Sequence, residues 1–271
     1  MLYQLSYPVV RGGEVLCRSQ PPRQAQTNHC PWAPAGTAVI LLRMPEGPPS
    51  PAWFSRLRGR FIVFDGPDGS GKTTQFKQTR RRLIEAGLEV CEVREPGATD
   101  IGEQIRDMLL DIKNKDSINL ACEMLLFMAS RAQLVAERIR PALAAGEVVM
   151  ADRFISSTLA YQGTAGGLPV QAIRATGDIA LGDTWPDLVV VFDVDQETAA
   201  KRLTPLLDRM EQKGAEYHAK VRQGYLDQAE HDPNHYAVID ARQAPEDVHA
   251  ALLETLENRS KIWSPHPSPS P

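Results

Sequence analysis

Residues 66–73 read GPDGSGKT and match the G-x-x-x-x-G-K-[ST] pattern of a phosphate-binding loop. The apolar run 61–65 precedes this loop and is typical of a buried parallel strand, while residues 72–86 have the pattern of a helix. Glycines let successive backbone N–H groups turn toward phosphate oxygens, and the helix start adds the positive end of its dipole. The alternative, a structural glycine-rich turn, does not require this strand-and-helix context.

The loop indicates a nucleoside triphosphate with Mg²⁺ as its ligand. In loops of this pattern the lysine, here Lys72, reaches the β- and γ-phosphates, and the hydroxyl of the next residue, here Thr73, ligates the metal. The residues expected to bind the nucleotide are Gly66, Asp68, Gly69, Ser70, Gly71, Lys72, Thr73 and Thr74. Kinases, GTPases, ATPases and helicases share such loops, so other motifs must identify the reaction.

Strand and helix patterns alternate between residues 60 and 259. Strands are predicted at 61–65, 90–93, 148–152, 188–193 and 236–239. Helices are predicted at 72–86, 101–110, 119–145, 170–181, 196–202, 217–230 and 245–259. Such alternation predicts an α/β fold in which helices cover both faces of a five-stranded parallel sheet. Ligands should bind beyond the carboxyl ends of the strands, just after Asp65, Val93, Asp152 and Asp193.

Composition separates three regions. Residues 1–59 are rich in Pro and Gly and are predicted to be a disordered extension, with a small regulatory module as the alternative. Residues 60–259 form the expected catalytic domain, and residues 260–271 are predicted to be a flexible Pro/Ser-rich tail. Four cysteines without a C-x-x-C pair indicate free thiols of a reducing compartment rather than a metal site.

Charge and hydropathy exclude several classes of protein. The 271 residues carry a formal net charge of -4, which argues against general nucleic-acid binding. The N-terminus lacks a signal-peptide pattern, and no apolar run approaches the roughly 18 residues that span a bilayer. The expected protein is soluble and cytoplasmic, with no membrane partner.

Two further clusters of polar residues follow predicted strands, and an aromatic–arginine pair lies between them. REPGAT occupies 94–99 and DRFISSTLAYQG occupies 152–163. Phe127 and Arg131 are four residues apart, so they share one helix face and could stack a base and hydrogen-bond its edge. Core packing of Phe127 and a solvated Arg131 are the alternatives. Asp152 and Arg153 end a buried strand, which is costly unless phosphate, Mg²⁺ or each other pairs with them.

Together with LLFMASRAQ, DRMEQ and VIDA, these motifs appear in order over residues 60–256, and this region resembles the thymidylate kinase family. The resemblance implies a P-loop NTPase fold with a short lid. It implies phosphorylation of dTMP by ATP in dTTP synthesis, through direct in-line transfer, by a homodimer. The alternatives are a kinase for another nucleoside monophosphate and a catalytically weak or inactive nucleotide-binding protein.

The resemblance assigns roles on the base and sugar side of the acceptor. Phe127 would stack on thymine and Arg131 would hydrogen-bond its O4. Thr158 would face the base, and Tyr161 would lie against the deoxyribose, where it disfavours a ribose 2′-hydroxyl. Gln162 is also among the residues expected to bind the substrate.

On the phosphate side, the resemblance makes Arg153 the residue that holds the dTMP phosphate. Asp152 would order Mg²⁺ through water, and Asp68 would bond the sugar 3′-hydroxyl or lie near the metal. Arg94 and Glu95 would line the acceptor pocket.

An arginine-bearing lid is expected at 202–211. It carries Arg209, the first candidate for transition-state stabilisation, and Arg202, the second, while surface ion pairing of Arg209 is the alternative. The expected catalytic residues are Lys72, Arg153, Arg209, Arg202 and Asp152.

Two positions depart from the family pattern. Ala98 stands where a second glycine is usual, which would cost about 1 kcal/mol if the site needs positive φ. Ser130 stands where an acidic residue is common. A GTPase is disfavoured, because the single Asn-Lys, at 114–115, lacks the N-K-x-D spacing and follows no apolar strand.

Overall fold

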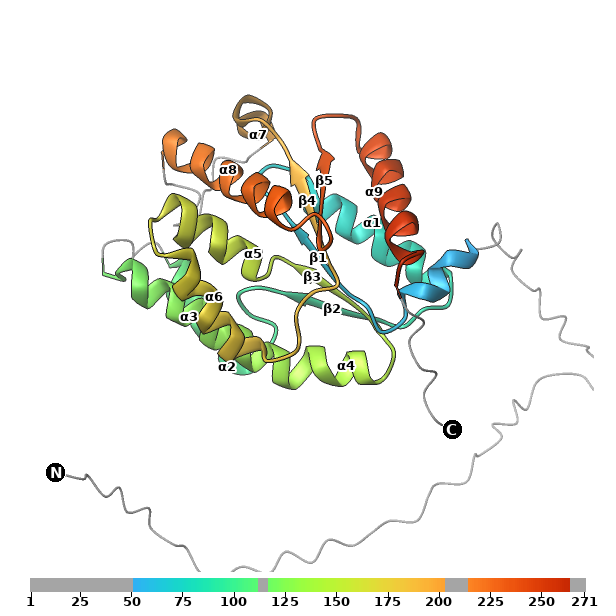
Figure 1. The fold of residues 1–271 in the computed structure, drawn as a ribbon, viewed down its shortest axis with the longest axis horizontal. Coiled ribbons are helices and arrows are strands. Elements are labelled where there is room, and N and C mark those ends of the chain that lie inside the picture. Colours follow the sequence, from blue (N-terminus) through green and yellow to red (C-terminus); the bar gives the residue numbers. More distant parts are fainter. Residues whose placement is uncertain (1–50, 112–116, 203–213, 264–271) are drawn as a thin grey trace, which may run out of the picture. The chain divides into compact units, whose positions relative to one another are not determined.

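The computed structural model describes residues 51–111, 117–202 and 214–263. In these ranges five parallel strands form one sheet in the order β2-β3-β1-β4-β5 (Figure 1). The strands are β1 (Phe61–Asp65), β2 (Val90–Arg94), β3 (Val148–Asp152), β4 (Leu188–Asp193) and β5 (Tyr236–Asp240). The predicted strands and the parallel α/β fold are confirmed, and β1, which leads into the phosphate loop, lies at the centre.

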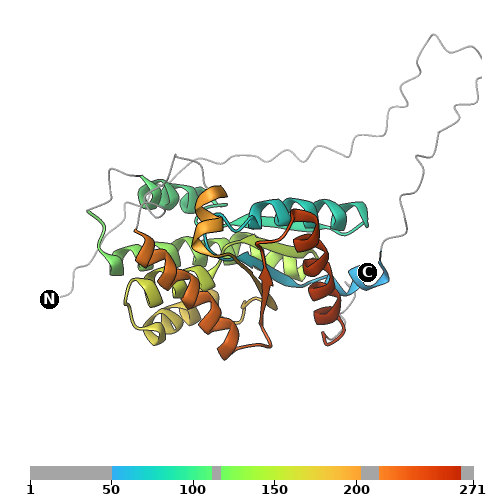
Figure 2. The ribbon, with the colours of Figure 1, turned by 90° about the horizontal axis from the view of Figure 1, so that it is seen from above.

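Helices cover both faces of the sheet, as Figures 1 and 2 show. α1 (Lys72–Glu85) and α9 (Pro245–Ser260) pack on one face. The other face carries α3, α4, α5, α6 and α8, which are Leu120–Leu134, Arg140–Ala144, Ile155–Thr158, Val170–Leu181 and Ala215–His231. α2 (Asp100–Leu110) packs along α3, and α7 (Gln196–Arg202) contacts α8.

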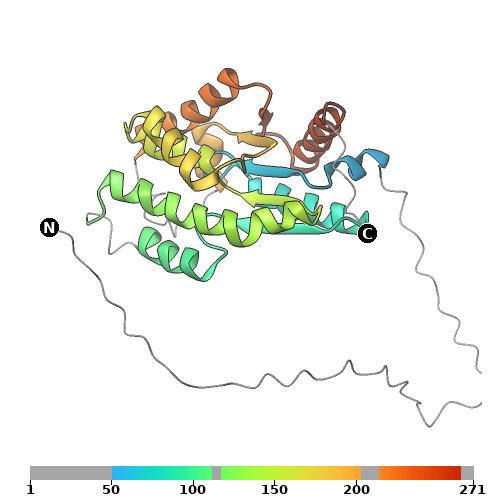
Figure 3. The ribbon, with the colours of Figure 1, turned by 60° about the horizontal axis from the view of Figure 1, so that its bottom comes forward.

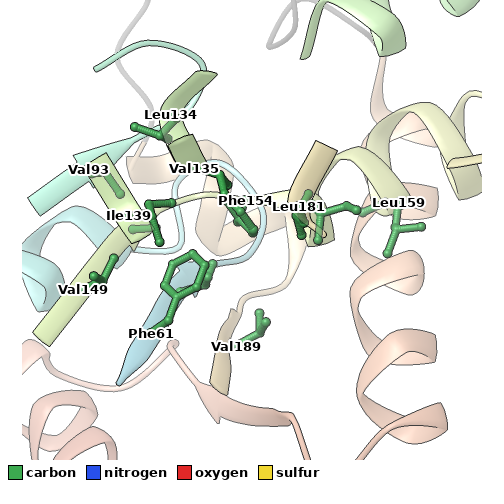
Figure 4. Packing of buried hydrophobic residues seen from close by; sticks show 14 of the residues in the cluster. Phe61, Val93, Leu134, Val135, Ile139, Val149, Phe154, Leu159, Leu181 and Val189 are labelled. Carbon is green, nitrogen blue, oxygen red and sulfur yellow. The ribbon is translucent and has the colours of Figure 1, made fainter. Parts of the chain in front are cut away.

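The core consists of two apolar layers because successive strand residues point to opposite faces of the sheet. Phe61 and Val63 enter one layer, whereas Ile62 and Phe64 enter the other. All residues of β1 are buried, as expected for a central strand covered by helices on both sides. Figure 4 shows Phe61 facing Phe154, and their ring centroids lie 4.9 Å apart.

The long helix predicted at 119–145 contains a π-helical turn. α3 continues through η3 (Val135–Ile139) into α4, and Figure 3 shows the three as one rod with α2 alongside. Asn119 caps the start, because its side-chain oxygen accepts from the Cys122 N–H at 2.8 Å.

A second π-helical turn, η4 (Leu159–Ala165), follows α5. The sequence analysis predicted no helix here, because the segment is short and lacks the alternation of apolar and exposed polar residues that marks an amphipathic helix. π-Helical turns frequently occur at functional sites, and η4 carries two of the residues expected to bind substrate.

The compact region extends past the boundaries predicted at residues 60 and 259. η1 (Ala52–Leu57) is a 3₁₀ helix whose Phe54 and Leu57 are buried against the α1–α9 side of the sheet. At the other end, Trp263 packs on the same layer, and the Arg60 guanidinium lies 5.2 Å from its ring centroid. The sequence analysis missed both short apolar segments, η1 and the residues around Trp263, because prolines flank them. No helix in the described ranges is long and apolar enough to cross a membrane.

Candidate active site

The phosphate loop joins β1 to α1, and neighbouring backbone fixes its glycines. At Gly66 (φ +134°) an added Cβ would lie 2.5 Å from the Phe192 carbonyl oxygen, and at Gly69 (φ +75°) 2.7 Å from that of Ala199. Side chains are therefore excluded from both positions. Ser70 Oγ is buried and has no hydrogen-bond partner in the described part of the chain. A phosphate oxygen would satisfy it, so the loop fits a nucleotide phosphate.

Three charged groups meet beside the loop. Asp68 forms ion pairs with Arg153 and with Lys72, whose Nζ lies 3.8 Å from Asp68 Oδ1. Burial by itself raises the pKa of Asp68, but the two cations outweigh it and hold that pKa at about 2. Burial and the neighbouring guanidinium of Arg153 lower the pKa of Lys72. Asp68 is therefore ionised at neutral pH and holds both cations at the loop.

Asp65 organises this region, although the sequence patterns assigned it no role beyond ending a strand. It is fully buried, and its Oδ1 accepts from the Gly66 N–H at 2.9 Å and the Tyr225 hydroxyl at 2.7 Å. Hydroxyls of Ser156 and Ser157 also donate to the carboxylate, at 2.6 and 2.8 Å. A buried carboxylate at the end of a strand needs such donors, and the serines after DRF were the available signal.

Arg153 contacts both carboxylates. Its Nη1 lies 3.4 Å from Asp65 Oδ1, and its Nη2 donates to Asp68. The residue has φ +69°, an uncommon conformation for a non-glycine residue, and its N–H donates to the Phe64 carbonyl at 3.0 Å. Strain at one backbone position therefore accompanies the placement of a guanidinium beside the phosphate loop.

An acceptor cavity opens next to these charges. The predicted residues that line it are Asp68, Glu95, Phe127, Arg131, Arg153, Thr158, Tyr161 and Gln162, and the others include Pro96, Leu110, Phe154 and Arg106. Eight of the side chains assigned to substrate thus line one cavity, drawn from the phosphate loop, the loops that follow β2 and β3, and α3, α5 and η4. Asp152, Thr73 and Arg202 lie elsewhere, and Arg94 is not among the lining residues.

Arg131 is held rigidly in the wall of the cavity. Its Nη2 lies 2.6 Å from Glu95 Oε2 and donates to Thr158 Oγ1 at 3.0 Å. Only 1% of Arg131 is exposed, which excludes the solvated alternative. Burial raises the pKa of Glu95 to about 7, although Arg131 opposes that shift. Phe127 is only half-buried and faces the same cavity, so it is not a simple core residue.

Tyr161 and Gln162 come from consecutive positions of η4 and extend to different partners. The Tyr161 hydroxyl donates to Asp68 Oδ2 at 2.6 Å, which ties this ring to the phosphate loop. Gln162 Nε2 donates to Glu123 Oε1 at 2.8 Å on α3. These two residues therefore bring a contact to the charged Asp68 and the polar Gln162 side chain into the wall of one cavity.

Arg106 lines the cavity where Arg94 was expected. The Arg94 side chain is half-exposed and pairs with Glu103 at 2.9 Å, on the outside of α2. Arg106 Nη1 donates to the Pro96 carbonyl at 2.8 Å, on the cavity side. Arg106 follows the buried Ile105 and so lies on the edge of the buried face of α2. This position was the sequence signal that could have placed Arg106 near the cavity.

A second cavity, the donor cavity, begins directly after Asp68. It is lined by Gly69, Ser70, Gly71, Lys72, Thr73, Thr74, Gln75, Arg202, Ala241, Gln243, Pro245 and Val248. Thr73 lies in the first turn of α1 in this cavity, and Asp152 ends β3. The charge of Asp152 offsets part of the lowering of the Lys72 pKa. A hydroxyl and a carboxylate are oxygen ligands of the kind that Mg²⁺ prefers, so these residues fit the expected metal.

A family model described as "Thymidylate kinase" matches residues 64–252. The chain belongs to the thymidylate kinase family. It is 42% identical over 206 residues to the thymidylate kinase of Caldanaerobacter subterraneus subsp. tengcongensis, over 76% of this chain and 98% of the relative. The thymidylate kinase of Chlorobium luteolum is 42% identical over 214 residues, or 75% and 99% of the two chains. The crystal structure of thymidylate kinase from Ehrlichia chaffeensis matches with a TM-score of 0.61 at 30% identity, over 74% of this chain and 99% of that one.

The lid expected from the thymidylate kinase resemblance lies largely outside the described residues. Arg209 falls within 203–213, so its predicted role is not tested. Arg202, at the end of α7, donates to the carbonyls of Ala241 at 2.8 Å and Arg242 at 3.3 Å. Arg202 therefore lies on the rim of the donor cavity, anchored to the loop between β5 and α9.

The two departures from the thymidylate kinase pattern lie together beside the acceptor cavity. Ala98 has φ +65°, so the expected backbone strain is present, and its N–H donates to Glu103 Oε1 at 2.6 Å. Ser130 is fully buried, and its Oγ accepts from the Gly97 N–H at 3.2 Å. In this chain a hydroxyl on α3 thus holds the REPGAT loop.

Proposed function

We propose that this chain transfers the γ-phosphoryl group of ATP to the phosphate of dTMP, giving dTDP and ADP for dTTP synthesis. One observation carries the proposal: the acceptor cavity ends at Asp68 and the donor cavity begins at Gly69, so one phosphate loop separates the two sites. The names of the relatives support the choice of dTMP as the acceptor.

The acceptor cavity has the groups that a pyrimidine deoxynucleotide needs. Phe127 supplies an aromatic face for stacking, and the buried guanidinium of Arg131 supplies a donor for O4 of thymine. Tyr161, tied to Asp68, would lie against the deoxyribose. Arg153 and Arg106 line the same cavity and would receive the acceptor phosphate.

Transfer would proceed in line and without a covalent enzyme intermediate. A phosphate monoester oxygen is ionised near neutral pH, so no side chain needs to remove a proton. The protein's task is to align two anions and to neutralise their charge, for which Asp68 holds both Lys72 and Arg153 at the phosphate loop. Mg²⁺ held near Thr73 and Asp152 would supply further neutralisation of the ATP phosphates. Arg209 remains the first candidate for the lid, since carbonyls already hold Arg202.

The test is ADP release from the full chain with ATP and Mg²⁺, with dTMP, dUMP, AMP, CMP and GMP offered in parallel. We expect turnover with dTMP and weaker turnover with dUMP. Lys72→Ala should abolish turnover without unfolding the protein, while Lys77→Ala, on the exposed side of the same helix, should keep it. Tight nucleotide binding without ADP release would instead identify an inactive binder.

A homodimer is the expected assembly, and apolar residues on α2 and α3 support it. Ile101, Met108 and Leu125 are 51%, 45% and 54% exposed on these adjacent helices, and apolar side chains that gather on one surface favour a protein–protein contact. Leu125→Glu should convert a dimer to a monomer in light scattering, whereas Ile262→Glu, 70% exposed beyond α9, should not. A monomeric wild-type protein would refute this assembly.

A further inference from the structure

Glu123 is a buried carboxylate that the proposed reaction leaves unused. It lies on α3 four residues before Phe127 and eight before Arg131, so the three side chains share one helix face. Phe127 and Arg131 line the acceptor cavity, whereas Glu123 lies behind its wall and is 1% exposed. Burying a carboxylate is costly, so a polar partner must justify its position.

One such partner is Gln162, which does line the cavity. Gln162 Nε2 donates to Glu123 Oε1 at 2.8 Å, and Gln162 is itself 1% exposed. A carboxylate can only accept hydrogen bonds, so the amide must turn its NH₂ group toward Glu123. Its oxygen makes no hydrogen bond to any residue that the structure describes. Gln162 therefore offers the cavity a hydrogen-bond acceptor.

An acceptor from Gln162 and a donor from Arg131 match one kind of pyrimidine. Thymine and uracil present an N3–H donor beside the O4 acceptor, whereas cytosine presents an N3 acceptor beside an amino donor. We propose that Glu123 is a positioning residue that fixes the Gln162 amide and so selects 4-oxo pyrimidines over cytosine. The inference rests on the proposed function only in taking the acceptor to be a pyrimidine nucleotide.

A structural role for Glu123 predicts a different experimental result. Acidic residues in the first turn of a helix stabilise it through the helix dipole, and Glu123 lies in the first turn of α3. If that were its whole role, replacing the charge would lower stability and leave the ratio of the two nucleotide affinities unchanged.

The decisive variant is Glu123→Gln, with dissociation constants for dTMP and dCMP measured by calorimetry on the full chain. A glutamine at 123 can accept or donate, so the Gln162 amide is free to present either end to the base. We expect the preference for dTMP over dCMP to fall by about tenfold, the worth of one correctly matched hydrogen bond. Glu246→Gln, an exposed acidic residue in the first turn of α9, is the matched control and should keep the wild-type ratio.

A swapped pair provides the rescue. In Glu123→Gln/Gln162→Glu the carboxylate at 162 can only accept, so an oxygen again faces the base and the glutamine at 123 donates to it. The double variant should regain preference for dTMP relative to Glu123→Gln. It also keeps the chemistry of the buried pair, so it remains informative if the single variant does not fold.

Binding and turnover separate the two proposals. Wild-type protein that prefers dTMP in calorimetry but releases no ADP would overturn the proposed function and leave the Glu123 inference standing. Active wild-type protein whose dTMP preference is unchanged in both variants would overturn the inference alone. Equal wild-type affinity for dTMP and dCMP would also overturn the inference, since there would be no selection to explain.

Discussion

Asp65→Asn tests whether the carboxylate at the end of β1 organises the site. Four hydrogen bonds from Gly66, Ser156, Ser157 and Tyr225 end on it, at 2.6 to 2.9 Å. Bonds to a charged group are worth roughly 1 kcal/mol more than neutral ones, so removing the charge at four bonds costs about 4 kcal/mol. Relief of the buried charge returns part of that loss, which leaves about 2 kcal/mol. In a domain of this size the melting temperature should fall by roughly 4–8 °C.

The same substitution should damage catalysis more than stability. Arg153 would keep Asp68 but lose Asp65, so kcat/KM for dTMP should fall by about tenfold or more, as for a misplaced phosphate-binding group. Thermal melts and steady-state kinetics are measured on the same preparations. Asp187→Asn is the control, because Asp187 caps the opposite end of β1, bonding the Phe61 N–H at 2.8 Å, and should lower stability only. An Asp65→Asn protein with an unchanged melting temperature and a kcat/KM within twofold of wild type would refute the reasoning.

Three other predictions follow from single positions. Ala98→Gly should raise unfolding stability in urea by about 0.5–1 kcal/mol, since φ +65° strains alanine while the extra chain entropy of glycine offsets part of the gain; a loss would contradict this. Gly69→Ala should abolish ATP binding in calorimetry, because its Cβ would meet the Ala199 carbonyl; wild-type affinity would count against the loop geometry. Burial raises the pKa of Glu95 from 4.5 to about 7 in the folded protein. Ionised Glu95 therefore lowers folding stability above about pH 7, and this loss of stability disappears as the pH falls toward 4.5. Protonation also weakens its hold on Arg131, so KM for dTMP should rise as pH falls through about 7, and Glu95→Gln should flatten that rise.

The sheet could be predicted from the sequence because its strands carry a signal of their own. Runs such as Phe61–Asp65 and Leu188–Asp193 are apolar up to a final aspartate, and that composition identifies a strand covered on both faces. The phosphate loop then placed β1, and strand ends placed the chemistry. η1 and η4 escaped prediction because short 3₁₀ and π-helical segments have no periodicity to detect.

The cavity residues were predictable where a motif named them, and not where only tertiary structure places them. Phe127 and Arg131 follow from spacing along a helix. Asp65 and Glu123 act through Tyr225 and Gln162, which lie 160 and 39 positions away, and Arg106 lies on the edge of a helix face; no local pattern records either relation. Arg94 was misplaced for the same reason, since Glu103 on α2 draws its guanidinium outward.

Asp68 lies on the boundary between the two cavities, and this position makes substrate affinities interdependent. Donor phosphates would bind Lys72 and an acceptor phosphate would bind Arg153, yet the Asp68 carboxylate pairs with both cations. By thermodynamic linkage, if one nucleotide changes the affinity for the other by some factor, the second changes the affinity for the first by the same factor. Calorimetric titration of dTMP with and without ADP, and of ADP with and without dTMP, should yield one coupling factor. Because that factor originates in largely buried ion pairs, which salt screens weakly, it should persist as salt is added.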